Sequence, residues 1–574
     1  MTRLSLRSKN HRCLALLLTG SLVAAACSGT GGGAGDEPGD ESREAGGTDA
    51  DAEVGPPQAG GSLVYGLEAE TTDGWCLPEA RLAISGIQVV RSMYDTLTVP
   101  DGDENFQPHL AESVEPNEDF TQWTITVREG VTFHDGSELT AEVVKNNLDA
   151  YRGARPPRSP DLFIFVFQDI ESVEVTGPRE VTVSMKRPWV SFDGFLYSSG
   201  RLGMMAQSQL DAEGQACRQQ PIGTGPFMLE QWRPNESLTL TRNPNYWRTD
   251  ENGEQLPYLE QLEYRPIPEV QQRVNGLQSG ELDAFHATSD DGGTLLEARD
   301  QADAGQINLI ESDDFSEVSH LMLNSGQPPF DNKLARQAVA LAVDNARINE
   351  VVRRGLPELA NGPFAPGAIG HLDDTGYPTE PDPERARQLA EQYEQETGEE
   401  LTFRINSTPV PEIVQIVQLV QEDLANIGIE TSTATFEQSA LIEQAITGDF
   451  QMSTWRNYPG LDPDGLYVWW HSQSPDGSPN PVNFPRINDS EVDRLLDEGR
   501  VTGDREQREQ IYQDLNRRLA EELYMLWGAW TIWAVPSATD VHGVVGARPV
   551  GTDGSEDYTG LALGHDPALL WREQ

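Results

Sequence analysis

The stretch at residues 221–247 constrains the fold of this chain more than any other segment. Gly223 and Gly225 flank a threonine and precede a proline, so a turn is predicted that combines glycine's freedom in φ with a fixed φ. Two runs of alternating side chains follow, Phe227–Trp232 and Ser237–Arg242, separated by an Arg-Pro-Asn-Glu turn. This pattern predicts a β-hairpin held between two tight turns.

Strand and helix patterns alternate along the rest of the chain. Period-two alternation predicts strands at Leu63–Leu67, Trp123–Arg128, Val173–Val175, Val181–Met185, Leu401–Ile405 and Ile429–Phe436. Helical spacing predicts helices at Ile84–Val99, Ala141–Tyr151, Lys333–Arg353, Pro383–Thr397, Ile413–Ile427 and Ser439–Ile446, and from 504 to about 522. Thr140 and Asp504 are predicted N-caps. Because the chain has 574 residues, we expect more than one domain, built as α/β lobes with mixed sheets.

The N-terminal 27 residues have the composition of an export signal. Basic residues precede a 14-residue apolar run, Cys13 to Ala26, which is too short to span a bilayer comfortably. Small residues directly before Cys27 resemble a lipobox, so we expect Cys27 to be lipidated and to anchor the protein to the outer face of the cell membrane. A plain secretory signal is the alternative. Residues 28–61 are rich in Gly, Asp, Glu and Pro, which predicts a flexible acidic tether.

Cysteine usage agrees with export. Of the four cysteines, Cys13 and Cys27 belong to the signal and the anchor, which leaves Cys76 and Cys217. Two cysteines in an oxidising compartment favour one disulfide, and metal binding by so distant a pair is the weaker alternative.

The charge balance excludes two kinds of partner. The chain has 41 basic and 93 acidic residues, a formal net charge of −52 with neutral histidines. Such a surface repels nucleic acid and anionic lipid, so neither is an expected direct partner, and membrane contact is expected through the lipid anchor alone.

Several motifs occur in an order that resembles one known family. Besides the 221–247 stretch they are Met93–Leu97 (similar to a "YDTL" helix end), 110–148, Arg273–Asp283 and Leu323–Asp331. Together, over roughly residues 60 to 550, they resemble family 5 of the bacterial extracellular solute-binding proteins. These are the large (cluster C) receptors of ABC importers for peptides, nickel and some sugars.

The resemblance implies a two-lobed, periplasmic-binding-protein-like α/β fold of type II, with mixed sheets and a hinge that the chain crosses twice. Carried onto this sequence, lobe 1 is 62–315 plus 532–574, with an inserted subdomain at about 98–185, and lobe 2 is 316–531. The crossings are expected near Glu311–His320 and Leu526–Ala534. A monomer that works with ABC permease subunits is the expected assembly.

Signatures of an enzyme are missing from the sequence. No His-Glu-x-x-His, Gly-x-Ser-x-Gly or Ser-x-x-Lys occurs, and the nine histidines are scattered singly. His134 and Asp135 lie at a turn without a nucleophile nearby. The Asp-Pro-Asp-Gly sequence that begins at Asp462 lacks the spaced acids of a calcium loop and is interpreted as a turn. We therefore expect no catalytic residue, metal or cofactor.

Aromatic residues beside polar ones indicate a ligand cleft, because tryptophan carries an N–H that needs a partner when buried. Trp75 is expected to be exposed on a loop. The candidate ligand contacts are Trp75, Trp189, Trp455, Arg456, Asn457, Tyr458 and Asp462.

The ligand itself is left open by the sequence. In peptide-binding members of the family, an aspartate shortly after the equivalent of Trp455 pairs with the peptide's α-amino group. Here no carboxylate stands between Trp455 and Asp462, although Asp462 could replace it. Arg456 either holds a ligand anion or pairs with acidic residues of the protein. We therefore expect aromatic stacking and neutral or anionic contacts, with peptide and non-peptide solutes about equally favoured.

The predicted function is capture of a small solute between two lobes and its delivery to an ABC importer. A receptor of the same fold for another solute or for sensing is the alternative, and a secreted lipoprotein enzyme is a distant one. The sequence does not identify the ligand, the permease, or whether the anchored protein is shed.

Overall fold

The computed structural model describes residues 55–70, 74–101, 105–160, 166–313, 317–457, 460–474, 477–544, 546, 561 and 565–574. They lie in one compact unit that spans Gly47–Gln574. The expected export signal, Cys27 and most of the expected tether fall outside the described residues. Within the described ranges, no helix has both the length and the apolar character needed to cross a bilayer.

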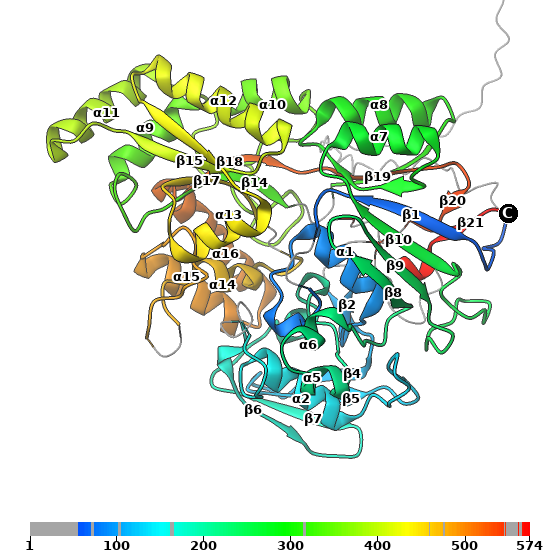
Figure 1. Ribbon diagram of the computed structural model, residues 1–574. Coiled ribbons are helices and arrows are strands. Elements are labelled where there is room, and N and C mark those ends of the chain that lie inside the picture. Colours follow the sequence, from blue (N-terminus) through cyan, green and yellow to red (C-terminus); the bar gives the residue numbers. More distant parts are fainter. Residues whose placement is uncertain are drawn as a thin grey trace, which may run out of the picture. The chain divides into compact units, whose positions relative to one another are not determined.

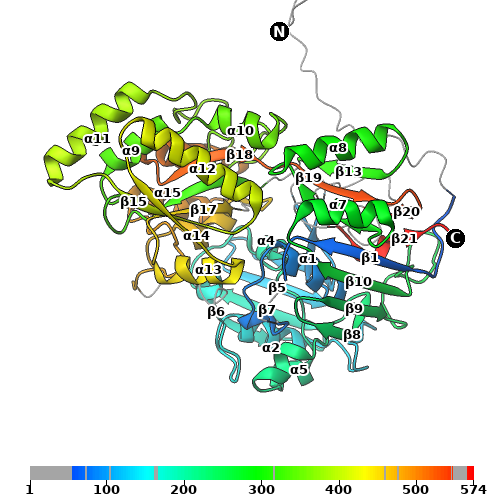
Figure 2. The ribbon, with the colours of Figure 1, turned by 45° about the horizontal axis from the view of Figure 1, so that its top comes forward.

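The largest sheet in the described chain has eight strands and combines the first strand, β1, with β19 from near the C-terminal end (Figure 1). Its strands, in spatial order, are β12 (Ala287–Thr288), β19 (Trp533–Ser537), β11 (Ala284–Phe285), β1 (Ser62–Leu67), β10 (Gln261–Pro266), β9 (Ser237–Arg242) and β8 (Phe227–Arg233), with β13 (Asn308–Ser312) also on β19. β1 runs parallel to β10 and β11, whereas β8, β9 and β10 are antiparallel, so the sheet is mixed as predicted. Helices α7 (Val270–Ser279) and α8 (Gly292–Asp303) lie together over this sheet, on the side away from α1 (Ile84–Met93) (Figure 2).

The predicted hairpin is confirmed as β8 and β9, joined by a turn in which Asn235 has a φ of 62°. Two glycines precede the hairpin, and they were predicted to be needed for their freedom in φ. The structure gives a different reason. Neither Gly223 nor Gly225 has a positive φ. A Cβ atom at either position would instead overlap the backbone of Met93, to whose carbonyl the Gly225 amide donates at 3.0 Å. The glycines therefore allow the hairpin to pack directly against the end of α1.

Replacing Gly225 by alanine is expected to destabilise the protein by about 1–3 kcal/mol, because the new methyl group must push two backbone segments apart. Urea unfolding of the purified protein measures the effect. Gly55→Ala, at a position where a Cβ has no neighbour within 4 Å, is the control and should not change the midpoint. Equal midpoints for the two variants would contradict this account of the glycine.

A separate four-stranded antiparallel sheet follows α1 in the chain, in the order β4 (Ala111–Pro116), β5 (Gln122–Val127), β7 (Glu180–Met185) and β6 (Ile170–Val175). Helix α2 (Ala141–Tyr151) packs on it, and its N-cap Thr140 accepts from the Val143 amide, as predicted. Shorter elements complete this region and its connection to β8: η2 (Leu77–Glu79), β2 (Thr98–Pro100), β3 (Phe106–Pro108), η3 (Phe167–Asp169), α4 (Phe192–Phe195), η4 (Ser198–Gly200), α5 (Gln207–Asp211) and α6 (Gln215–Gln219).

A five-stranded sheet organises the second half of the described chain, in the order β16 (Thr431–Thr435), β15 (Phe403–Ser407), β17 (Met452–Asn457), β14 (Val318–Leu323) and β18 (Met525–Trp530). All six residues of β14, which lies between β17 and β18, are buried. The surrounding helices are α9 (Lys333–Ala342), α10 (Asn345–Arg353), α11 (Pro383–Thr397), α12 (Pro411–Asn426), α13 (Gln438–Thr447), η5 (Pro463–Leu466), α14 (Tyr467–Trp470), α15 (Ser490–Val501) and α16 (Arg505–Glu522). After β19 the chain ends with β20 (Val541–His542), η7 (Pro567–Leu569) and β21 (Trp571–Arg572).

Two predicted helices are wrong in extent. The segment Lys333–Arg353 forms α9 and α10 rather than one helix, because Asp344 breaks the pattern by capping α10, with its side chain accepting from the Arg347 amide. The helix predicted at Ile84–Val99 ends at Met93, since Tyr94 is extended and the following residues lead into β2. Both corrections reflect local hydrogen bonding and tertiary contacts that override helical spacing.

The disulfide prediction is confirmed. Cys76 and Cys217 are bonded, and both are buried. The bond ties the loop after β1 to α6, which leads into the turn before β8. It therefore connects two segments that lie 141 residues apart in sequence.

The described chain passes between the two large sheets at two places. β13 ends in the eight-stranded sheet at Ser312 and β14 begins in the five-stranded sheet at Val318. The chain returns between Trp530, at the end of β18, and Trp533, at the start of β19. One large cluster of buried apolar side chains is built mainly on the eight- and four-stranded sheets, and a second is built on the five-stranded sheet.

Candidate functional site

A cavity of about 840 Å³ is lined by residues attached to both large sheets. Glu68 follows β1 and Asp290 precedes α8, on the side of the eight-stranded sheet. Trp455, Arg456 and Asn457 face it from the end of β17 in the five-stranded sheet. The volume falls within the range of sites for small solutes.

One wall of the cavity is apolar. Helix α12 contributes Ile413, Ile416 and Val420, and α13 contributes Leu441 and Ile442. Aromatic rings extend this wall at Trp455, Trp469 and Phe484. The rings of Trp455 and Trp469 lie 5.4 and 5.6 Å from that of Phe484, so the three form one aromatic group.

Another part of the cavity is charged and centres on Arg456. Its Nη2 donates to Glu68 Oε1 at 2.7 Å, and its Nη1 lies 3.2 Å from Glu317 Oε1 and 4.0 Å from Asp290 Oδ2. Asp290 Oδ1 accepts from Arg353 Nε at 2.9 Å. These carboxylates come from segments far apart in the sequence and meet only in the folded chain.

Within this cluster, the pKa of one carboxyl group is lowered and that of another is raised. Burial by itself would raise the pKa of Glu68, but Arg456, together with His286 and Arg273, lowers that pKa to about 2. Burial raises the pKa of Glu317 to about 7; Arg456 opposes this rise, whereas the charges of Glu68 and Asp290 add to it. Arg456 therefore attracts both carboxylates, and the raised pKa of Glu317 reflects its burial and the charges of Glu68 and Asp290.

The two possibilities for Arg456 are now distinguished. Its guanidinium pairs with acidic residues of the protein, and these are the buried or partly buried Glu68, Glu317 and Asp290 rather than exposed surface acids. Attraction to these carboxylates outweighs burial and raises the pKa of Arg456. A ligand anion would have to compete with all three carboxylates, so this arginine is not a ready anion site.

Three other residues of the 455–462 segment were predicted to contact the ligand, and the structure describes two of them. Asn457 lines the cavity, and its buried Nδ2 has no hydrogen-bond partner within the described chain. Asp462 also lines the cavity, but both its oxygens accept from Arg508 at 2.6 Å and it caps η5, so it is not free to replace the family's aspartate. Tyr458 lies outside the described residues.

Trp75 and Trp189 lie elsewhere, and neither is among the residues that line the cavity. The expectation that Trp75 is exposed is wrong: it is 1% exposed, and its ring packs 5.5 Å from that of Trp232. Trp189 is fully buried, and its Nε1 donates to Asp464 at 2.8 Å. As ligand contacts both remain predictions, and their observed contacts are those of core residues.

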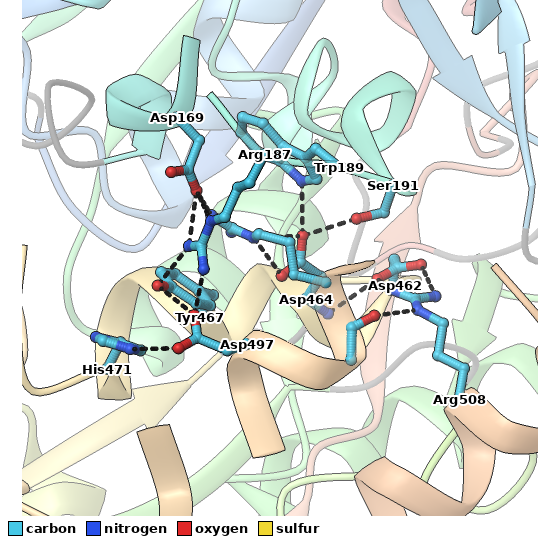
Figure 3. A network of polar contacts seen from close by, with 12 residues as sticks. Asp169, Arg187, Trp189, Ser191, Asp462, Asp464, Tyr467, His471, Asp497 and Arg508 are labelled. Atoms are coloured by element: carbon cyan, nitrogen blue, oxygen red, sulfur yellow. Dashed lines mark hydrogen bonds and ion pairs between the residues drawn. The ribbon is translucent and has the colours of Figure 1, made fainter. Parts of the chain in front are cut away.

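The Trp189–Asp464 hydrogen bond belongs to a buried polar network between the region of the four-stranded sheet and helices α14 and α15 (Figure 3). Arg500 donates to Asp464 and Asp169 at 2.9 Å, and its guanidinium lies 3.7 Å from the Tyr467 ring centroid. The remaining members are Arg187, which pairs with Asp169 and Asp497, and Ser191, which donates to Asp464. The network therefore joins the region of the four-stranded sheet to helices α14 and α15.

Sequence reasoning missed Glu68, Asp290, Glu317 and Arg353. With 93 acidic residues in the chain, single carboxylates carry no signal of their own. Their positions were the available clue: Glu68 directly follows a predicted strand, and Glu317 lies in a predicted crossing. Within the described ranges, no group of three or more His, Cys, Asp or Glu side chains is arranged to hold a metal ion.

Comparisons with known proteins place this geometry in context. The family model for "Bacterial extracellular solute-binding proteins, family 5 Middle" matches residues 105–479. The oligopeptide-binding protein AppA of Bacillus subtilis is 26% identical over 547 residues, covering 89% of this chain and 91% of that protein.

Solved structures show the same fold. The structure of DppA from Helicobacter pylori in complex with the peptide STSA has a TM-score of 0.77 at 21% identity, and covers 90% of this chain and 99% of that one. AgaA from A. tumefacien R10, in complex with agropinic acid, has a TM-score of 0.76 at 22% identity, and covers 90% of this chain and 99% of that one.

Proposed function

The chain belongs to family 5 of the bacterial extracellular solute-binding proteins, and from this membership we propose that it captures a small solute between two lobes for an ABC importer. The observation that carries the proposal is the cavity of about 840 Å³, whose walls come from both large sheets. A solute in this cavity contacts both sheets at once. The solute therefore stabilises the closed arrangement of the lobes over the open one. The size of this stabilisation equals the difference between its binding free energies for the two arrangements.

The lobes follow the sheets in this proposal. Lobe 1 is 62–315 plus 532–574, with the region of the four-stranded sheet, at about 98–185, inserted into it, and lobe 2 is 316–531. Supporting this division, the eight-stranded sheet takes its strands from residues 62–312 and 533–537, and the five-stranded sheet from 318–530. The two crossings, near Glu311–His320 and Leu526–Ala534, then form the hinge. The receptor acts as a monomer.

Two kinds of solute fit this proposal. AppA and DppA are named for oligopeptides or crystallised with a peptide, whereas AgaA was crystallised with agropinic acid. Trp455, Arg456, Asn457, Tyr458 and Asp462 are the proposed contacts. The protein performs no covalent chemistry in this role. The alternative is a receptor of the same fold that serves sensing.

The function is tested by calorimetry of the purified mature protein against a panel of peptides, opine-type acids, sugars and metal–histidine complexes. Saturable binding of at least one class, without turnover of the bound solute, is the expected result. Failure of the whole panel to bind would contradict the receptor function, and turnover would favour an enzyme. Permease genes beside the gene for this protein would favour transport over sensing.

Membrane attachment through Cys27 completes the proposal and yields a second prediction. Lipoprotein anchoring supplies several acyl chains, and one chain alone binds membranes only reversibly. Cys27→Ser should therefore release the protein from the membrane fraction into the medium, as measured by immunoblotting of both fractions. Cys13→Ser, within the apolar part of the signal, is the control and should leave the protein attached. Unchanged membrane retention of Cys27→Ser would contradict the anchor.

A further inference from the structure

The buried polar network of Figure 3 is divided between the two proposed lobes. One set of its side chains lies in and just after the region of the four-stranded sheet, in lobe 1, and the other lies on η5, α14 and α15, in lobe 2 (Figure 3). The two sets are Asp169, Arg187, Trp189 and Ser191, and Asp464, Tyr467, Asp497 and Arg500. They meet through side-chain contacts, because the described chain passes between the large sheets elsewhere.

The centre of this contact is buried. Arg500, whose side chain is 1% exposed, donates from Nη1 to Asp169 Oδ2 at 2.9 Å, and its Cζ lies 4.5 Å from the ring centroid of Trp189. The Val190 amide donates to the Arg500 carbonyl at 3.0 Å. Trp189 Nε1 donates to Asp464 Oδ2 at 2.8 Å. The two lobes therefore share backbone, ionic and aromatic contacts from which water is excluded.

The edge of the contact is partly exposed and centres on Arg187. This arginine of lobe 1 donates to the Tyr467 hydroxyl at 2.6 Å and pairs with Asp497, both in lobe 2. The Tyr467 hydroxyl in turn donates to Asp497 at 3.0 Å. Asp497 is 43% exposed, so a substitution there does not leave a buried group without a partner.

Each set of side chains is fixed to the core of its own lobe. Trp189 belongs to the same cluster of buried apolar side chains as Leu63 of β1 and Leu262 of β10. Tyr467 belongs to the cluster that contains Leu495 and Leu496 of α15. Movement of one large sheet away from the other would therefore separate the two sets and break the contacts between them.

The charges are distributed so that each lobe keeps an ion pair when the lobes separate. Asp169 and Arg187, both in lobe 1, pair at 2.8 Å. Asp464 and Arg500, both in lobe 2, pair at 2.9 Å. Separation breaks the contacts between these pairs and leaves none of the four groups without an opposite charge. Because an isolated buried charge is the costly case, the contact is able to open and close reversibly.

These contacts form without a solute. Arg187, Asp497 and Arg500 are not among the described residues that line the cavity, although Ser191 is. Burial by itself would raise the pKa of Asp169, but Arg500 and Arg187 lower it, so this carboxylate is attracted by the cations of both lobes. The network therefore favours the closed arrangement whether or not the cavity is filled.

We propose that these eight side chains form a latch that keeps the empty receptor closed, and that the latch opens to admit a solute. This inference rests on the two lobes of the proposed function and adds that closure does not require a solute. A bound solute adds its own contacts to a closed arrangement that the protein already favours.

The test measures the distance between the lobes in the solute-free protein. Glu174→Cys and Glu506→Cys carry nitroxide labels at exposed positions of β6 in lobe 1 and α16 in lobe 2. Cys27→Ser supplies the mature protein in solution, and Cys76 and Cys217 are bonded to each other. Pulsed electron paramagnetic resonance should show mainly one distance, which matches the separation of the two positions in this structure.

Two variants open the latch at its exposed edge. Asp497→Asn combined with Tyr467→Phe changes both lobe 2 partners of Arg187 and leaves the buried ion pairs in place. A second, longer distance should appear, and the open-to-closed ratio should rise about tenfold, because an ion pair and a hydrogen bond are lost. Arg187→Gln weakens the same contacts from lobe 1 and should have the same effect. Circular dichroism checks that each variant is folded.

The neighbouring residue of α15 supplies the matched control. Glu498 is 47% exposed and pairs with Arg494, which lies in the same lobe. Glu498→Gln therefore removes a carboxylate of similar exposure from the same helix without affecting a contact between the lobes. It should leave the measured distance unchanged.

The outcomes separate the latch from the receptor function. A solute-free protein found mainly at the longer distance, or a short distance that persists in both the double variant and Arg187→Gln, would overturn the latch. Either result leaves the receptor function standing, because solute binding is measured independently by calorimetry. A longer distance in these variants but not in Glu498→Gln would support the latch, even if no solute of the panel binds and the receptor function is overturned.

Discussion

Replacing both Cys76 and Cys217 by alanine is expected to lower the free energy of unfolding by about 4–5 kcal/mol. The disulfide joins residues 141 positions apart, so its removal restores a large amount of conformational entropy to the unfolded chain. Both side chains are buried, and alanine keeps the site apolar. The native contacts around the loop after β1 and α6 are therefore expected to persist. Guanidinium unfolding of the mature protein, followed by tryptophan fluorescence, measures the difference.

A reductant supplies the control for this disulfide experiment. It should shift the unfolding midpoint of the wild type toward that of the double variant and leave the variant itself unchanged. A double variant as stable as the oxidised wild type would show that the bond adds nothing to stability.

The second large effect is expected in the buried network of Figure 3. Arg500→Met should lower the free energy of unfolding by about 3–5 kcal/mol, because it leaves a buried carboxylate without its cation. Asp464 is 0% exposed and loses its contact with Arg500, keeping only the hydrogen bonds from Trp189 and Ser191. Urea unfolding at neutral pH measures the change.

The same substitution at an exposed position is the matched control. Arg494 pairs with Glu491 and Glu498 on the surface of α15, and Arg494→Met should cost no more than about 1 kcal/mol. A double-mutant cycle with Asp464→Asn tests the origin of the effect. The double variant should be less destabilised than the sum of the two single variants, because neither charge is then left alone. Strict additivity would contradict a direct pairing of the two side chains.

Most secondary structure of this protein was predictable because it depends on neighbouring residues. The helix at Pro383–Thr397 was predicted with its observed ends, and the N-caps Thr140 and Asp504 accept the expected backbone hydrogen bonds. The hairpin of β8 and β9 was predicted from alternation and turn residues. Where a side chain competed with helical spacing, as Asp344 does between α9 and α10, the predicted helix was too long.

The candidate site was predictable only where it lies on one segment. Trp455, Arg456 and Asn457 were identified as a group and line the cavity together at the end of β17. Trp75 and Trp189 were chosen by the same aromatic criterion and lie away from the cavity lining. The criterion does not distinguish a cleft from a core, because a buried tryptophan can satisfy its N–H within the protein, as Trp189 does with Asp464.

Family, α/β architecture and the cysteine pair were determined by the sequence, since each depends on local patterns or on the order of motifs along the chain. The polarity of the candidate site was decided by the tertiary structure. The sequence near Trp455 has no carboxylate and suggested neutral or anionic contacts. Folding brings Glu68, Asp290 and Glu317 to Arg456 from three distant segments. Coulomb interactions act through space and are strongest where water is excluded, so the charge of this cavity follows from which segments meet there.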